Sequence, residues 1–220
     1  MANAPPTRIF LRPIGSPATI GMAGLAVASL VQSGFDLGWV AKSQAPEVGV
    51  IMIAVPFVLQ LSASVFSYLA RDGAAGAATG LLATTWLAIG VLHVVSPGRS
   101  SGALGLLLLS AAVVLALSAA AMSLGKILMG AVVLLAATRF ALAGIYELSA
   151  NGSWQDAAGI LGLVVCGLAA YAVLAFELEG QQRKAVLPTF RHGRGELSVD
   201  GDWGHQLDGV VHEAGVRQVS

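Results

Sequence analysis

Charged residues are scarce in this sequence: Asp, Glu, Lys and Arg make up 11% of the 220 residues, and twelve basic residues balance twelve acidic ones. The balance excludes the strongly basic surface typical of nucleic-acid binding, and the single cysteine, Cys166, excludes an intrachain disulfide. His192, His205 and His212 lack metal-site spacing, and no phosphate loop or zinc-protease motif is present. No nucleophile, base and orienting group recur at motif spacing. We therefore expect no catalytic residues, no metal and no cofactor, and an enzyme is the weakest class.

Apolar residues, in contrast, are abundant: 56% of the chain is hydrophobic and the mean hydropathy is +0.78. They form six stretches near the roughly 20 residues that a helix needs to cross a bilayer. These stretches are 17–40, 48–70, 74–95, 102–122, 127–148 and 157–176. Short connections rich in Gly, Pro and Ser require neighbouring helices to run antiparallel. The sequence thus predicts an all-α integral membrane protein, with a six-helix transmembrane bundle over residues 17–178.

Basic residues near the ends of these stretches predict the orientation, because they are retained on the cytoplasmic side. Lys42 and Arg99 lie on one side of the bundle. Eight others lie on the opposite side: Arg8, Arg12, Arg71, Lys126, Arg183, Lys184, Arg191 and Arg194. Both termini are therefore expected in the cytoplasm, as segments 1–16 and 179–220, in a multi-pass protein of the cell membrane. The polar composition predicts a largely disordered tail over residues 189–220.

Arg139 lies within the fifth apolar stretch, where an ionised side chain is costly. It must face a wet cavity or pair with a carboxylate such as Asp36 or Glu147. Both acids lie toward the outer ends of their helices, whereas helical side chains lean toward the N-terminus, so we expect either pairing to be strained. Two roles stay open: a pore-lining anion attractor, or a structural residue held by carbonyls and hydroxyls. His93 is expected to be an interfacial residue.

The start of the first stretch carries a recognisable pattern. Ser16 is placed to cap a helix that begins at Pro17, and a helix start beside a cavity attracts a carboxylate. The alternative is an ordinary capped membrane helix. The run Ser-Pro-Ala-Thr-Ile-Gly-Met over 16–22 resembles the Asn-Pro-Ala-Pro-Leu-Gly-Leu signature of the acetate uptake transporters, the family of the succinate-acetate permeases. Gln60, the Thr-Thr-Trp run at 84–86, and the Arg-Lys-Ala-Val-Leu-Pro run at 183–188 are also similar to that family.

The resemblance implies a six-helix protomer that assembles into a homohexamer, each protomer with its own pore for small carboxylates. It implies a substrate pathway and a constriction, the latter formed in the family by Phe, Tyr and Leu. The pathway residues are Ser16, Pro17, Gln60, Thr84 and Arg139, and the constriction residues are Leu25, Leu82 and Ala136. This chain departs from the family at the constriction, at Ser67, where the family has a glutamate, and at Arg139, where it has an apolar residue.

We therefore expect a transporter or channel for small monocarboxylates such as acetate, located in a bacterial inner membrane, with proton linkage left open. The expected partners are the lipid bilayer, the carboxylate and further copies of the chain. Two alternatives remain. One is a pore for a small neutral solute such as urea or ammonia, which the smaller constriction residues would suit. The other is a non-transporting membrane scaffold that keeps the same fold.

Overall fold

The computed structural model describes residues 15–182, 184–193 and 196, and these fold into a helical bundle. The elements are α1 (Pro17–Asp36), η1 (Lys42–Gln44), α2 (Ala45–Met52), η2 (Ile53–Phe57), α3 (Val58–Leu69), α4 (Gly73–Val95), α5 (Gly102–Ser123), α6 (Ile127–Ser149) and α7 (Gly152–Gln182). The elements from η1 to α3 form one continuous span, Lys42–Leu69. Within the described residues there are thus six helices long and apolar enough to cross a membrane. The six-helix transmembrane fold predicted from the sequence is confirmed.

Local sequence signals account for several helix ends. Asp72 and Ser101 cap α4 and α5, because their side chains accept hydrogen bonds from the backbone amides of Ala75 (3.2 Å) and Leu104 (3.3 Å). α1 begins at Pro17 as expected, with Ser16 at the N-cap position. The exposed Ser16 side chain, however, accepts no hydrogen bond from the helix, so the predicted side-chain cap does not form.

A buried proline changes the middle of the second span. Pro56 has no backbone N–H and its ring crowds the preceding turn, so regular α-helical hydrogen bonding cannot continue through it. The chain widens there into the π-helical turn η2, which packs against α1 and α4. The second span is therefore α-helical on both sides of this turn.

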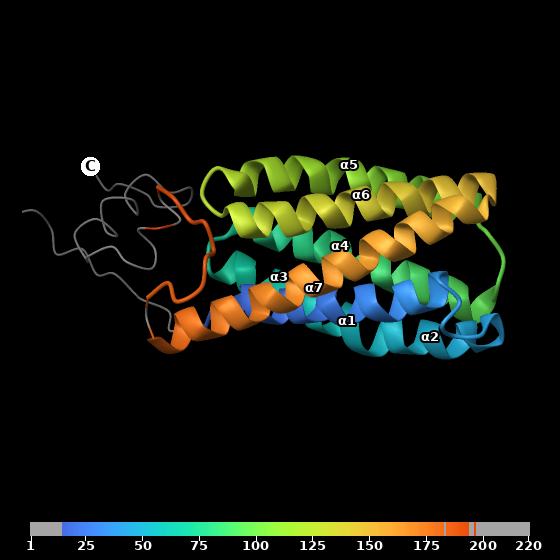
Figure 1. The fold of residues 1–220 in the computed structure, drawn as a ribbon, viewed down its shortest axis with the longest axis horizontal. Coiled ribbons are helices and arrows are strands. Elements are labelled where there is room, and N and C mark those ends of the chain that lie inside the picture. Colours follow the sequence, from blue (N-terminus) through green and yellow to red (C-terminus); the bar gives the residue numbers. More distant parts are fainter. Residues whose placement is uncertain (1–14, 183, 194–195, 197–220) are drawn as a thin grey trace, which may run out of the picture.

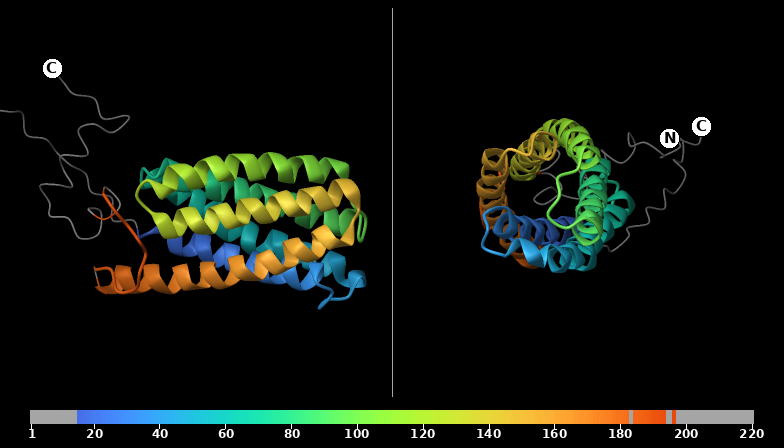
Figure 2. Two further views of the ribbon diagram at one scale, coloured as in Figure 1. Left: turned by 45° about the horizontal axis from the view of Figure 1, so that its top comes forward. Right: turned by 90° about the vertical axis from the view of Figure 1, so that its right-hand side faces the viewer.

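The six spans form a closed ring in their order along the chain. Each span contacts the next, and α7 closes the ring by packing against both α6 and α1. The end-on view in Figure 2 shows this ring, and Figure 1 shows α7 running obliquely across α6 and α1. α1 begins and α7 ends at the same end of the bundle, as an even number of crossings requires (Figure 1).

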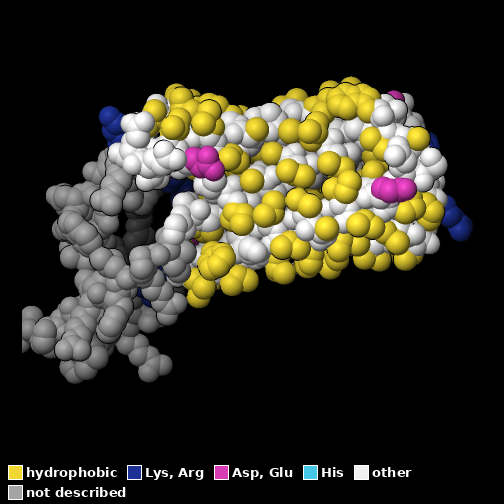
Figure 3. All heavy atoms as spheres, turned by 90° about the horizontal axis from the view of Figure 1, so that it is seen from below, with side chains coloured by type: hydrophobic (Ala, Val, Ile, Leu, Met, Phe, Trp, Pro, Cys, Tyr) yellow, Lys and Arg dark blue, Asp and Glu magenta, His cyan; other side chains and the backbone are white. Residues whose placement is uncertain are grey.

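The outside of the ring is apolar where lipid would surround it. Leu106, Val113 and Leu117 on α5 are each more than 60% exposed. Figure 3 shows hydrophobic side chains spread along one side of the bundle, with the Asp, Glu, Lys and Arg side chains in view near its two ends. This distribution fits a protein surrounded by hydrocarbon at mid-height and by polar surroundings at both ends.

The last helix is longer than expected and the chain then folds back on the bundle. α7 continues to Gln182, and residues 184–193 return to the turn between α5 and α6. The carbonyls of Phe190 and Thr189 accept hydrogen bonds from the amides of Ile127 and Leu128, both 3.4 Å, which have no partner within their own helix. Thr189 is buried. Residues 189–193 thus lie against the bundle, which differs from the disordered tail predicted from Thr189, and the rest of that tail lies outside the described residues, apart from residue 196.

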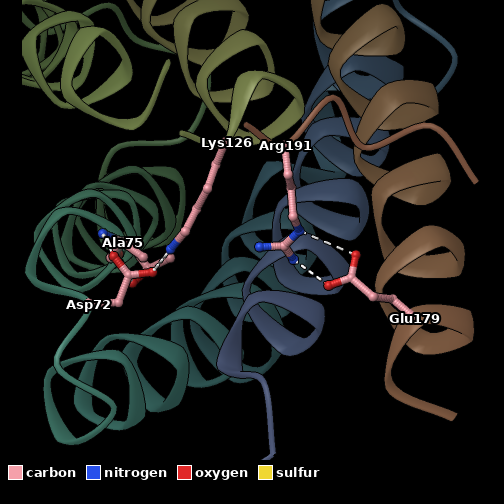
Figure 4. A network of polar contacts seen from close by, with 6 residues as sticks. Asp72, Ala75, Lys126, Glu179 and Arg191 are labelled. Carbon is pink, nitrogen blue, oxygen red and sulfur yellow. Dashed lines mark hydrogen bonds and ion pairs between the residues drawn. The ribbon is translucent and has the colours of Figure 1, made fainter. Parts of the chain in front are cut away.

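Two ion pairs join the connections at this end (Figure 4). Lys126 pairs with Asp72, which links the α5–α6 turn to the start of α4. Arg191 donates two hydrogen bonds to Glu179, at 2.6 and 3.3 Å, and its guanidinium lies over the ring of Phe176. Arg191 therefore fastens the returning segment to α7.

Candidate functional site

A pocket opens at the end of the bundle opposite the returning segment 184–193. We call it the outer pocket, after the orientation that the basic residues predict. It encloses about 580 Å³ of empty space, counting its open mouth. Its walls come from α1, α4, α5, α6, α7 and the α4–α5 connection. Its polar lining residues are Gln32, Asp36, His93, Arg99, Arg139, Tyr146, Glu147 and Gln155.

Arg139 and Asp36 form an ion pair in this pocket. Arg139 Nη2 donates a hydrogen bond to Asp36 Oδ2 at 3.0 Å, and the side chains are only 2% and 9% exposed. Asp36 is the last residue of α1, so its side chain leans back into the bundle toward Arg139. The pairing expected to be strained is thus present, because the long arginine side chain spans the remaining separation.

Two glycines of α7 leave the space that the ion pair occupies. A Cβ on Gly162 would lie 2.1 Å from Ser33 Oγ and 2.6 Å from Arg139 Nε, and one on Gly159 would lie 3.2 Å from Asp36 Cβ. The first two separations are shorter than any normal van der Waals contact, so only glycine fits at 162 without a shift. The bare backbone of α7 at Gly162 therefore allows α1 and α6 to bring the charges together.

A hydrogen-bonded chain leads from the ion pair to His93. Gln32 Nε2 donates to Asp36 Oδ1 at 2.9 Å, and Gln32 Oε1 lies 3.2 Å from His93 Nε2. The His93 ring packs edge-on against Phe35 with centroids 4.9 Å apart. His93 therefore lines the pocket near the end of α4, and its place at the membrane interface stays a prediction. Gln32 was missed, and its spacing of four residues before Asp36 on one helix was the available signal.

Among the described residues, several buried polar atoms of α1, α4 and α6 lack a hydrogen-bond partner, and one of them belongs to the Arg139 guanidinium. Its Cζ lies 5.5 Å from the centroid of the Trp86 ring. Within the described part of the chain, the buried atoms that have no hydrogen-bond partner include Arg139 Nε, Trp86 Nε1, Ser33 Oγ and Ser29 Oγ. Because an arginine carries five N–H donors, a single bond to Asp36 leaves Arg139 poorly satisfied. The guanidinium thus keeps donors for a further acceptor.

Glu147, the second carboxylate considered for Arg139, has another partner. Glu147 Oε2 accepts a hydrogen bond from the backbone amide of Ser101 at 2.6 Å, which ties the end of α6 to the start of α5. Glu147 also lines the pocket, but it is not paired with Arg139. The two acids therefore have separate roles.

The other predicted pathway residues lie at different places in the bundle. Gln60 is fully buried, its Nε2 donates to the carbonyl of Gly21 at 3.3 Å, and its Oε1 has no partner among the described residues. Ser16 and Pro17 lie at the end of the bundle remote from the outer pocket. Thr84 is exposed on the outside of α4, and its neighbour Thr85 is fully buried. Each of these pathway roles stays a prediction.

The three residues predicted to form the constriction face the interior. Leu25, Leu82 and Ala136 are each 1% exposed and belong to one continuous cluster of buried apolar side chains, together with Trp86 and Phe140. They come from the first, third and fifth spans, as the resemblance implied. Their role as a constriction stays a prediction.

A closed ring of six apolar helices with a polar pocket at one end defines the class: a multi-pass helical membrane protein. The fold is similar to that in a solved structure described as the bacterial acetate channel SatP, with a TM-score of 0.71. The likeness covers 80% of this chain and 99% of that chain at 20% sequence identity. At this identity the likeness shows the fold. No family model and no curated protein sequence matches the chain.

Proposed function

We propose that this protein is a membrane channel or transporter for small monocarboxylates such as acetate. The pathway follows the axis of the ring, from the outer pocket past Arg139 and the cluster of Leu25, Leu82 and Ala136, toward the opposite end. The observation that carries the proposal is the buried arginine in the pocket with N–H donors to spare. The shared fold with the acetate channel supports it. We further propose a homo-oligomer, a hexamer by the family resemblance.

The chemistry of a guanidinium suits this ligand class. Its planar fork matches the two oxygens of a carboxylate, and a charge-assisted hydrogen bond is stronger where water is scarce. Arg139 is 1% exposed as a residue, so an anion that reaches it leaves bulk water. Gln60 adds a second buried polar group, with an unpartnered amide oxygen that suits a donor on the solute or a water molecule.

A specific observation also favours a neutral solute such as urea. Asp36 already neutralises Arg139, and the charged residues of the pocket balance, with Arg99 and Arg139 against Asp36 and Glu147. A pocket without net charge has no long-range preference for anions. Comparing the fluxes of charged and neutral solutes separates the two functions.

The test is the flux of labelled acetate, succinate, lactate and urea into proteoliposomes, expressed per folded oligomer. We expect acetate flux above that of empty liposomes, reduced in Gln60→Ala and reduced most in Arg139→Gln. An anion-binding role predicts that Arg139→Lys keeps much of the flux, because it retains the charge. The exposed Lys42→Gln, at the same end of the bundle, is the matched control. If no carboxylate flux exceeds the blank under any proton gradient, the chain is a scaffold or a neutral-solute pore.

A further inference from the structure

We infer that Arg139 is a carboxylate-binding residue whose site is occupied in this structure by Asp36 as an internal counter-ion. A solute carboxylate replaces Asp36 at the guanidinium when Asp36 takes up a proton. The inference rests on the proposed function and deepens it, because it names the residue that recognises the solute and the group that is displaced.

The geometry of the pair favours exchange over a permanent ion pair. A guanidinium and a carboxylate bind most strongly through two parallel hydrogen bonds, but Asp36 and Arg139 share one, from Nη2 to Oδ2. The second Asp36 oxygen is turned toward Gln32 Nε2 at 2.9 Å. Asp36 thus uses only Nη2 of the guanidinium, and both residues line a pocket that opens outward. A small carboxylate can therefore approach a guanidinium that is joined to Asp36 by a single hydrogen bond.

Because the charged side chains of Arg139 and Asp36 are buried, the exchange must leave the net charge of the site unchanged. The side chains of Arg139 and Asp36 are 2% and 9% exposed, so removal of one charge alone would leave the other buried and uncompensated. The exchange keeps the charge of the site constant. A proton forms a bond to an Asp36 carboxylate oxygen, the ion pair with Arg139 breaks, and the incoming carboxylate pairs with Arg139. One proton and one anion enter the site together, and no net charge is added.

The surroundings of Asp36 offer the proton a route from the pocket. His93, on α4, lines the same pocket and is joined to Asp36 through the side-chain amide of Gln32. Gln32 is a positioning residue, since its two ends hold His93 and Asp36 in register. The other polar and charged groups that face the Asp36 carboxylate come from α6 and α7: Arg139, Tyr146, Glu147, Gln155 and Asp156. Among the described residues Arg139 is the cation paired with Asp36, whereas Arg99 lines the same pocket from the α4–α5 connection, so a solute that binds at Arg139 must share it with Asp36.

The experiment measures binding of radiolabelled acetate to the purified full-length protein in detergent, between pH 5.5 and 8. If each acetate binds with one proton, its affinity in the wild type falls about tenfold for each unit that the pH rises. In unbuffered solution, about one proton is then taken up per acetate bound. Asp36→Asn imitates the protonated acid, so it should bind acetate without pH dependence and without proton uptake. At pH 8 it should bind more tightly than the wild type.

A double variant protects the test against misfolding. Asp36→Asn with Arg139→Gln replaces the ion pair by two amides, which leaves no buried charge, and it should not bind acetate. Glu47→Gln is the matched control, because it changes an exposed carboxylate at the same end of the bundle that does not line the pocket. It should behave as the wild type does.

Several outcomes overturn the inference. They are acetate binding by the wild type without pH dependence or proton uptake, unchanged pH dependence in Asp36→Asn, and acetate binding by the double variant. Failure of the proposed function looks different. Proton-linked binding in detergent without flux in proteoliposomes rejects the channel and keeps the site, whereas flux with pH-independent binding rejects the exchange and keeps the channel.

Discussion

Replacement of Gly162 by alanine should specifically disturb the contact between α7 and the ion pair. The added Cβ would lie 2.1 Å from Ser33 Oγ and 2.6 Å from Arg139 Nε. Neither atom can retreat easily, because Ser33 is fully buried and Arg139 is held by Asp36 and Trp86. α7 must therefore move away from α1 and α6, or the ion pair must shift.

The cost follows from the overlap. Overpacking a close-packed interior destabilises by roughly 1–3 kcal/mol. Gly167 is the matched control, since it lies on the same helix, is exposed, and has nothing within 4 Å of an added Cβ. Gly167→Ala should gain up to about 1 kcal/mol from helix propensity alone. The two variants should thus differ by about 1–4 kcal/mol, or roughly 2–16 °C in Tm for a chain of this length.

Thermal unfolding of the purified protein in detergent measures this difference. Adding Ser33→Ala to Gly162→Ala removes the nearest clashing atom, whose hydroxyl has no partner to lose, and should restore about half of the lost Tm. Equal Tm values for Gly162→Ala and Gly167→Ala would refute the argument. They would show that α7 does not press on the ion pair.

Three further predictions concern the interior, the returning segment and the orientation. Ala136→Phe should block or slow acetate flux, whereas Leu134→Phe, on the exposed face of α6, should change it little; equal effects would place the pathway elsewhere. Glu179→Gln leaves Arg191 without its carboxylate partner at a largely buried position, so the free energy of unfolding in detergent should fall by about 2 kcal/mol. An unchanged Tm would argue against the role of Arg191 in fastening the returning segment. In intact cells that carry a cysteine-free version of the protein, an impermeant thiol reagent should label Ser100→Cys and spare Gly73→Cys. The reverse pattern would show that the orientation is the opposite of the predicted one.

The sequence was sufficient for the architecture, because apolar length and short breaker-rich connections determine where helices cross a bilayer. It was less informative about irregular places. Pro56 lies in an apolar run that reads as an uninterrupted span, and the π-helical turn that absorbs it depends on packing against α1 and α4. The extension of α7 to Gln182 was also missed, since the polar residues after Phe176 resemble the start of a tail.

The site was predictable in part. Arg139 was identified because a charge in an apolar stretch demands an explanation, and Asp36 was one of two partners considered. The choice between them depended on how far α1 and α6 are offset, which residue spacing does not reveal. The run Thr-Thr-Trp at 84–86 locates a motif without telling which face of the helix points inward, and of its two threonines Thr84 is exposed and Thr85 is buried.

The order of the ring has a consequence for biosynthesis. Spans that neighbour each other in the chain also neighbour each other in space, so most helix contacts can form as each hairpin emerges. The contact between α1 and α7 is the largest exception, because it joins the first span to the last. Asp36 is made 103 residues before Arg139, and Gly162 is made later still. Until α7 arrives, the ring has an open seam beside the ion pair, and a nascent chain stalled before Gly152 would expose its two charges to lipid. Completion of the last helix is thus the step that seals the polar interior from the bilayer.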